Sequence, residues 1–142
     1  MYKKIPIALL ALTLALPTFA AEWVLLTTAD DSKTFVDMDS IRKTDDGTVK
    51  MWIKAVYENR RALDSSVPTK YFRSTLSLAL INCAAETSMY GQGIWYEGND
   101  GDGAIVMTHD WANEPVNYRS APPGTLGAAE MRWGCAWKKA QR

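Results

Sequence analysis

Few side chains in this sequence could do chemistry, and their spacing argues against a reaction. Asp37 and Asp39 resemble a pair of catalytic carboxylates, but acids beside a turn at a strand end usually cap the backbone or contact water. His109 is the only histidine, so it cannot form a zinc site by itself, and no nucleophile motif accompanies it. The sequence also contains no phosphate-binding glycine loop. We therefore predict that the protein is not an enzyme.

The loop from Gly98 to Gly103 has some of the oxygen-bearing residues that a calcium ion would need. Asn99, Asp100 and Asp102 lie among its glycines. Their side chains do not supply ligands at alternate positions, however, and no glutamate closes a twelve-residue loop. We therefore predict a hairpin turn without a metal, and we expect no cofactor elsewhere in the chain.

Residues 1–20 have the features of a secretory signal peptide. Two lysines precede an apolar run from Ile5 to Leu16, and Thr18 and Ala20 are small residues at the minus-three and minus-one positions of a cleavage site. The apolar run is shorter than the ~20 residues of a membrane-spanning helix. We expect cleavage before Ala21, which leaves residues 21–142 as a single exported domain with no integral membrane segment.

Cys83 and Cys135 are the two cysteines of the chain. In an oxidising compartment, an even number of cysteines favours one intrachain disulfide, and two free or intermolecular thiols are the alternative. The loop closed by such a bond is more than 50 residues long. The chain-entropy model gives roughly 4 kcal/mol of stabilisation for a loop of that length.

The charge balance of the chain gives no reason to expect nucleic acid as a partner. Without the two lysines of the signal peptide, 14 of the 16 basic residues remain, against 16 acidic ones. A near-neutral chain of this kind lacks the basic surface that attracts nucleic acids or anionic membranes.

The elements around these residues are predicted from the alternation of polarity, which is clearest at 48–58. One face of this predicted strand carries Val49, Met51, Ile53, Ala55 and Tyr57. The opposite face is mostly polar and includes Trp52, so we expect an antiparallel sheet with one face on a core. Further strands are predicted at 22–29, 33–38, 70–82, 86–97 and 104–109, and a C-terminal helix at 125–139. The fold class is therefore α+β, with about six strands.

The predicted sheet leaves three questions open: the face on which Cys83 lies, what covers Trp52, and the role of residues 59–69. On a regular strand, Cys83 would share a face with Arg73 and not with Leu76, Leu78 and Leu80. The C-terminal helix could cover Trp52, or Trp52 could belong to an aromatic binding surface. Residues 59–69 read as an exposed loop, in which Arg60 and Arg61 are candidate partner-binding residues, although a solvated loop without function is the alternative.

The order of several short motifs resembles the surface-adhesin protein E family of Gram-negative bacteria. These motifs are an N-terminal tryptophan strand, FVDMDSIRK, VKMWIKAVY, a strand ending in Cys83, APPGTLG, and Cys135 in the last helix. The resemblance covers nearly all of residues 22–138. It implies an antiparallel sheet whose C-terminal helix is tied to it by a disulfide between the two cysteines.

The same resemblance implies a non-enzymatic surface adhesin. Some relatives bind host extracellular-matrix and plasma proteins such as vitronectin, laminin and plasminogen. The adhesin that names the family is lipid-anchored, whereas here no cysteine follows the apolar segment to accept a lipid. We therefore expect a periplasmic or secreted protein, and display at the cell surface does not follow from the resemblance. A periplasmic protein that maintains the envelope, with another envelope protein as its partner, is the alternative.

Overall fold

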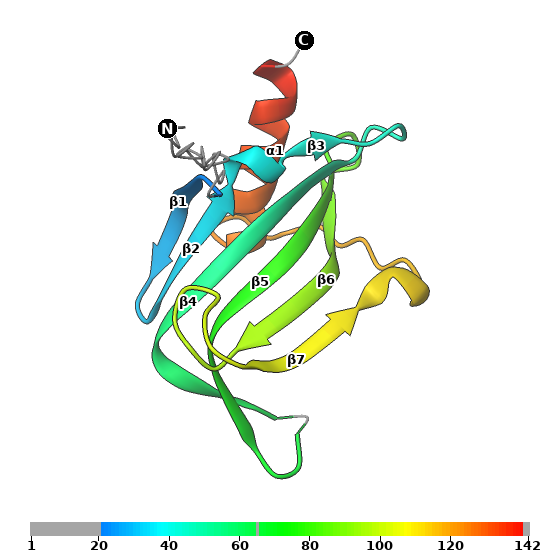
Figure 1. Ribbon diagram of the computed structural model, residues 1–142. Coiled ribbons are helices and arrows are strands. Elements are labelled where there is room, and N and C mark those ends of the chain that lie inside the picture. Colours follow the sequence, from blue (N-terminus) through cyan, green and yellow to red (C-terminus); the bar gives the residue numbers. More distant parts are fainter. Residues whose placement is uncertain (1–20, 65, 141–142) are drawn as a thin grey trace, which may run out of the picture.

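The structure is a computed structural model that describes residues 21–64 and 66–140, so the predicted signal peptide lies outside the described residues. It contains an antiparallel sheet with the strand order β1-β2-β4-β5-β6-β7, and the short β3 pairs with β4 (Figure 1). The strands are β1 (Trp23–Ala29), β2 (Ser32–Asp37), β3 (Arg42–Lys43), β4 (Val49–Leu63), β5 (Lys70–Asn82), β6 (Thr87–Tyr96) and β7 (Ile105–Asp110).

One α-helix, α1 (Leu126–Ala140), follows the strands, and two 3-10 turns, η1 (Met38–Ser40) and η2 (Trp111–Asn113), interrupt the connections. The predicted α+β class and the C-terminal helix are confirmed. No helix in the described part of the chain is both long and apolar enough to cross a membrane.

The core lies between α1 and one face of the sheet. In β4, the predicted apolar parity is buried at Val49, Met51 and Ile53. The register pairs Val49 with Ile81 and Met51 with Ala79, and directly paired residues share a face of an antiparallel sheet. Val36 and Ile41 complete this buried cluster.

Helix α1 approaches the sheet closely at Gly134. A Cβ atom at this position would lie 2.7 Å from Ile81 Cδ1 and 3.5 Å from Val49 Cγ1, so a larger residue does not fit without a shift. Glycine lowers the intrinsic stability of a helix by about 1 kcal/mol relative to alanine. The close packing explains why glycine nevertheless occupies this position.

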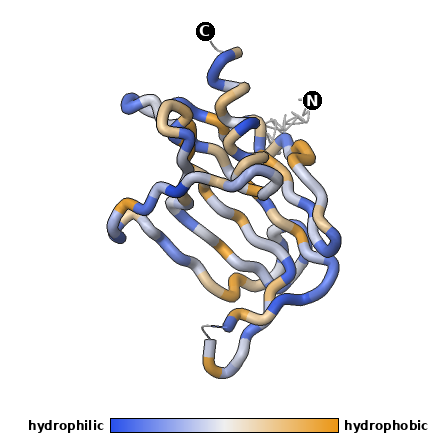
Figure 2. Tube along the Cα trace, turned by 180° about the vertical axis from the view of Figure 1, so that it is seen from behind, coloured by the Kyte–Doolittle hydropathy of each residue, from blue (hydrophilic) through white to orange (hydrophobic). Residues whose placement is uncertain are grey.

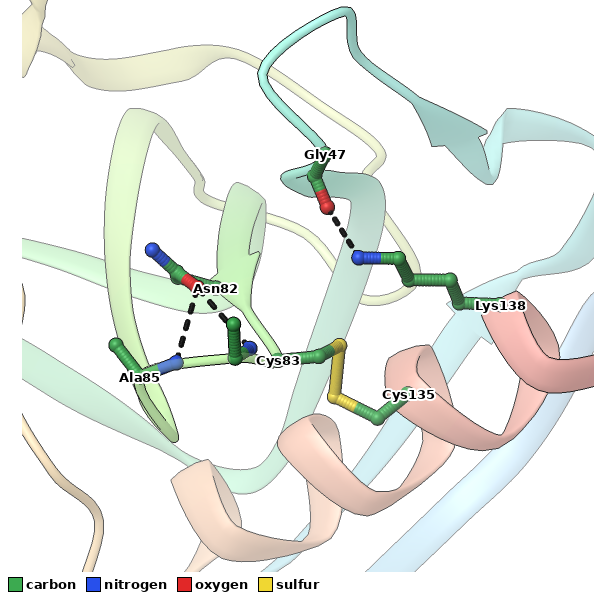
Figure 3. The surroundings of a disulfide bond; sticks show 7 residues. Gly47, Asn82, Cys83, Ala85, Cys135 and Lys138 are labelled. Carbon is green, nitrogen blue, oxygen red and sulfur yellow. Dashed lines mark hydrogen bonds between the residues drawn. A yellow bond between two sulfur atoms is a disulfide. The ribbon is translucent and has the colours of Figure 1, made fainter.

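A disulfide and a hydrogen bond fix the second half of the helix to the sheet and its loops (Figure 3), and a third contact caps its first turn. Cys83 at the end of β5 is bonded to Cys135 on α1, as predicted. Lys138 Nζ donates a hydrogen bond to the carbonyl oxygen of Gly47, 2.6 Å away. At the other end of the helix, the Thr125 hydroxyl caps the first turn by accepting from the Ala128 amide at 3.3 Å.

The disulfide also identifies which face of β5 lies on the helix. Cys83 shares its parity with Ala79 and Ile81, which are buried under α1. Leu76, Leu78 and Leu80 are on the other face, where they are half-buried. The small and β-branched residues of β5 therefore line the core, and the leucines face away from the helix.

The face with the leucines is partly covered by the turn at Gly98–Gly103. The Ser74 hydroxyl donates to the carbonyl of Gly98 at 2.7 Å and accepts from the amide of Gly101 at 2.9 Å. Asp100 on this turn forms an ion pair with Lys54, a β4 residue that is only 5 % exposed. The Lys54 ammonium also lies 4.3 Å from the centre of the Trp23 ring.

We predict that Gly134→Ala lowers stability, although the same change in an exposed helix raises it. The gain in helix propensity is about 1 kcal/mol, whereas overpacking a core costs about 1–3 kcal/mol, so a net loss of about 1 kcal/mol is expected. Thermal unfolding measures this as a decrease of a few degrees in the midpoint.

The matched control is Ala136→Gly at an exposed position of α1. This change should also lower the midpoint, because only helix propensity acts there. A higher midpoint for Gly134→Ala would contradict the close packing of the helix on the sheet.

Candidate functional site

The segment with the predicted partner-binding arginines is a projecting hairpin and not a loop. Strand β4 continues to Leu63 and β5 begins at Lys70, so the prediction of an irregular segment at 59–69 was wrong for its first half. After a register shift between Val56 and Arg61, the two strands pair again. Both faces of this extension are largely solvated, so no polar and apolar alternation marked it as a strand. We call residues 57–73 the arm.

The arm projects from the end of the sheet that is opposite α1 (Figure 1). It has four cationic side chains and two carboxylates within 57–73. Its tip includes Val67, which is 99 % exposed, and Tyr71 is 46 % exposed. Hydrophilic and hydrophobic segments thus lie side by side on this projection (Figure 2).

The two candidate arginines have different environments. Arg60 is exposed, and its guanidinium carbon lies 5.2 Å from the centre of the Tyr71 ring. Arg61 forms an ion pair with Asp31 and lies 4.8 Å from the centre of the Tyr57 ring. Arg60 is therefore available to a partner without loss of an internal ion pair, whereas Arg61 is already paired.

Trp52 lies on the sheet face opposite α1, so the interpretation that the C-terminal helix covers it was wrong. Its neighbour across the strand pair is Leu78 on β5. The indole side chain is half-buried, and its backbone amide donates to the Ser40 hydroxyl at 2.9 Å. Trp52 and the arm arginines are at different places on the sheet and do not form one cluster.

Other residues considered for chemistry have local structural roles. Asp37 caps η1 through a 3.1 Å hydrogen bond from the Asp39 amide. His109 Nε2 lies 2.7 Å from Glu114 Oε1, and its ring centre lies 4.5 Å from that of Trp111. In the described ranges, no group of three or more His, Cys, Asp or Glu side chains is placed to hold a metal ion.

A groove of about 660 Å³ lies between β6, the first half of α1 and residues 111–125, which we call the strap. The strap is held to β6 by two backbone hydrogen bonds of 2.9 Å between Ser88 and Arg119. Residues from all three parts line the groove: Tyr90, Trp111, Glu114, Val116, Arg119 and Glu130.

Glu130 is the most unusual residue of this groove. It is 1 % exposed, and its two carboxylate oxygens lie 3.0 and 3.1 Å from the donating hydroxyl of Tyr90. Burial raises the pKa of Glu130 to about 7, although the hydrogen bond from Tyr90 acts in the opposite direction. Burial and the neighbouring Glu130 also raise the pKa of Tyr90. A carboxyl group that titrates near neutrality thus lines an open groove.

Sequence reasoning did not find Glu130, although a weak signal exists. A glutamate in a helix is usually solvated. Glu130 is three residues after Gly127 and four before Gly134, so it shares the helix face on which the close-packed glycines lie. An acidic residue on a face of small residues indicates burial.

Comparisons with known proteins support the fold. The family model described as "Surface-adhesin protein E" matches residues 23–136. A structure of Haemophilus influenzae protein E is similar with a TM-score of 0.60 and 18% identity, covering 89% of this chain and 94% of that one. Crystal form II of the same protein gives a TM-score of 0.56 at 18% identity, with 75% and 82% of the chains covered. No curated protein sequence matches this chain.

We predict that Glu130 makes the stability of the protein fall as the pH rises from about 4.5 to 7. Below pH 4.5, the usual pKa of a glutamate, the Glu130 carboxyl group is protonated in both the folded and the unfolded states. As the pH rises, Glu130 ionises first in the unfolded state, because its pKa is higher in the folded state. The free energy of unfolding therefore falls, by a total on the order of 3 kcal/mol once the pH is above 7. Glu130→Gln does not ionise, so its free energy of unfolding relative to wild type should be greater at pH 8 than at pH 5.

Urea unfolding at the two pH values measures this difference, and Glu97→Gln, at an exposed position, is the control. The control should differ from wild type by the same small amount at both values. If the difference in free energy of unfolding between Glu130→Gln and wild type is also the same at both pH values, the raised pKa is contradicted.

Proposed function

The chain belongs to the surface-adhesin protein E family, and we propose that it is an exported, non-enzymatic binding protein for host extracellular-matrix or plasma proteins. Its site of action is the periplasmic or external side of the envelope. The proposal rests on the family and on one structural feature, the projecting arm. No catalytic residue is assigned.

The position of the arm favours contact with a large partner. A hairpin that extends beyond the sheet can approach a protein surface without obstruction by α1 or the strap, which lie elsewhere on the sheet (Figure 1). Its backbone is already paired between β4 and β5, so binding does not have to order it. A preformed projection of this kind supports an adhesin and has no evident use inside the fold.

The side chains of the arm favour an acidic partner. Arg60 and Tyr71 are stacked and exposed, and arginine and tyrosine are enriched among the residues that dominate protein interfaces. The excess of cationic over acidic side chains on the arm attracts an acidic surface and increases the association rate at low ionic strength. Val67 and Pro68 at the tip add exposed apolar area beside these charges. Of the candidate residues, Arg60 is thus proposed as the principal contact, with Arg61 and Trp52 secondary.

We predict that Arg60→Ala weakens binding to an acidic matrix or plasma-protein ligand without loss of stability. The thermal midpoint should change little, because exposed substitutions usually alter stability by less than about 0.5 kcal/mol. The affinity should decrease roughly tenfold at low salt, and the dependence of binding on salt should become weaker. Immobilised vitronectin, laminin and plasminogen, each tested at two ionic strengths, provide the assay.

The matched control is Lys43→Ala on β3, an exposed cation outside the arm. This variant should bind like the wild type. If the wild type binds none of these ligands, the adhesin proposal fails and an envelope protein is favoured. If Arg60→Ala and wild type bind equally, the contact surface is not the arm.

A further inference from the structure

The groove between β6, α1 and the strap contains a buried carboxylate without a cationic partner. Within residues 21–64 and 66–140, no lysine, arginine or histidine forms an ion pair with Glu130. Its hydrogen-bond donor is the Tyr90 hydroxyl, which carries no positive charge. An ionised carboxylate in such a place is costly unless a cation or several donors reach it. The groove lies beside this carboxylate, and because Glu130 is 1 % exposed, a cation in the groove reaches it only when the covering side chains move apart.

The walls of the groove suit a ligand with an apolar stem. Trp111 and Val116 on the strap line one side, and Tyr90 on β6 lines another. Val116 is 76 % exposed, so a ligand in the groove would remove apolar surface from water. Tyr90 and Trp111 are also aromatic, and aromatic rings attract a positive charge over their faces.

We propose that this groove binds a primary alkylammonium group, either of a free amine or of a lysine side chain, with the ammonium on Glu130 and the stem against Trp111 and Val116. This ligand site is independent of the arm and of the proposed adhesin function. It assigns a ligand-binding role to a buried carboxylate whose hydrogen bond from Tyr90 also joins α1 to β6.

The charges around the groove favour a cation over an anion. Two carboxylates, Glu114 and Glu130, line it, against one guanidinium, that of Arg119. Arg119 is exposed, and its Nε donates to Asn117 at 3.2 Å. An acidic ligand in contact with the floor of the groove would meet the Glu130 carboxylate. The carboxylate thus discriminates against anions.

The geometry of Glu130 favours an ammonium over a guanidinium. Both of its oxygens already lie within hydrogen-bond distance of the Tyr90 hydroxyl. A guanidinium binds a carboxylate best through both oxygens in a bidentate arrangement, whereas an ammonium is a compact charge that can use one remaining lone pair. A lysine-like ligand can therefore bind without displacement of Tyr90.

Binding should depend on pH through Glu130. The other titratable groups that face this region are Tyr90 on β6, His109 on β7, and Glu114 and Arg119 on the strap. Because the folded pKa of Glu130 is about 7, an ammonium must displace a proton at lower pH. The affinity should therefore fall about tenfold per pH unit well below pH 7.

Amide NMR of the purified protein tests the proposal with three probes: pentylamine, N-acetyl-lysine amide and, as the uncharged match, N-acetyl-norleucine amide. At pH 8 at least one of the two cations should shift the amides of Ser88, Tyr90 and Gly127. The norleucine probe should bind at least about tenfold more weakly. Binding of pentylamine alone identifies a free amine as the ligand, and binding of the lysine amide alone identifies a side chain.

Glu130→Gln should weaken binding of the cation at least about tenfold and remove its pH dependence, whereas Glu97→Gln should leave both unchanged. If Glu130→Gln does not fold, the pH dependence of wild-type binding remains as the test. The proposal is overturned if neither cation shifts the groove amides, if norleucine amide binds equally well, or if wild-type affinity is flat between pH 5 and pH 8. Pronounced pH dependence that persists in Glu130→Gln would show that another group controls binding, and this would also overturn the proposal.

Discussion

The close contact between α1 and the sheet is the constraint on which the rest of the structure depends. Gly134 allows the helix to approach Ile81 and Val49, and the bond between Cys83 and Cys135 fixes the helix to the end of β5. A disulfide that links residues 52 positions apart stabilises mainly by restricting the unfolded chain, by roughly 4 kcal/mol. The helix contains two glycines and would be weak alone, so its order comes from this docking.

The docking of α1 on one face determines which surfaces remain for function. The arm extends from the sheet away from the helix (Figure 1), so its exposed side chains can vary without a cost to the core, whereas Phe72 at its base is buried. The groove, in contrast, exists only because the first half of α1 and the strap are held beside β6. The arm is therefore independent of helix docking, and the groove depends on it. The partner proposed for the arm and the ligand proposed for the groove would therefore bind separately.

The sequence predicted the strands in which one face is buried and the other is exposed to solvent. Alternation in β4 identified Val49, Met51 and Ile53 as core residues, and the even count of cysteines identified the disulfide. In β5 both faces are apolar enough to be a core, so periodicity did not indicate that Ala79 and Ile81 lie under the helix.

The arm and the burial of Glu130 could not be predicted from periodicity, for different physical reasons. Residues 58–62 of the arm are exposed on both faces, so they show no alternation, and only cross-strand pairing defines them as part of a strand. Glu130 is buried because tertiary packing brings β6 and the strap over the helix, and a single residue in a helix carries little information about such packing. Arg60 was identified as a candidate from its residue type and its place in a predicted exposed loop, whereas the difference between Arg60 and the ion-paired Arg61 required coordinates.

Hydrogen exchange of a variant in which both cysteines are replaced, Cys83→Ala with Cys135→Ala, tests the docking of α1 most directly. The double change leaves no free thiol. If docking of the helix depends on the disulfide while the sheet has a core of its own, the amides of Leu126–Ala140 should lose protection and those at the centres of β4 and β5 should largely keep it. An equal loss of protection in α1, β4 and β5 would contradict this account, because it would mean that helix and sheet unfold as one unit.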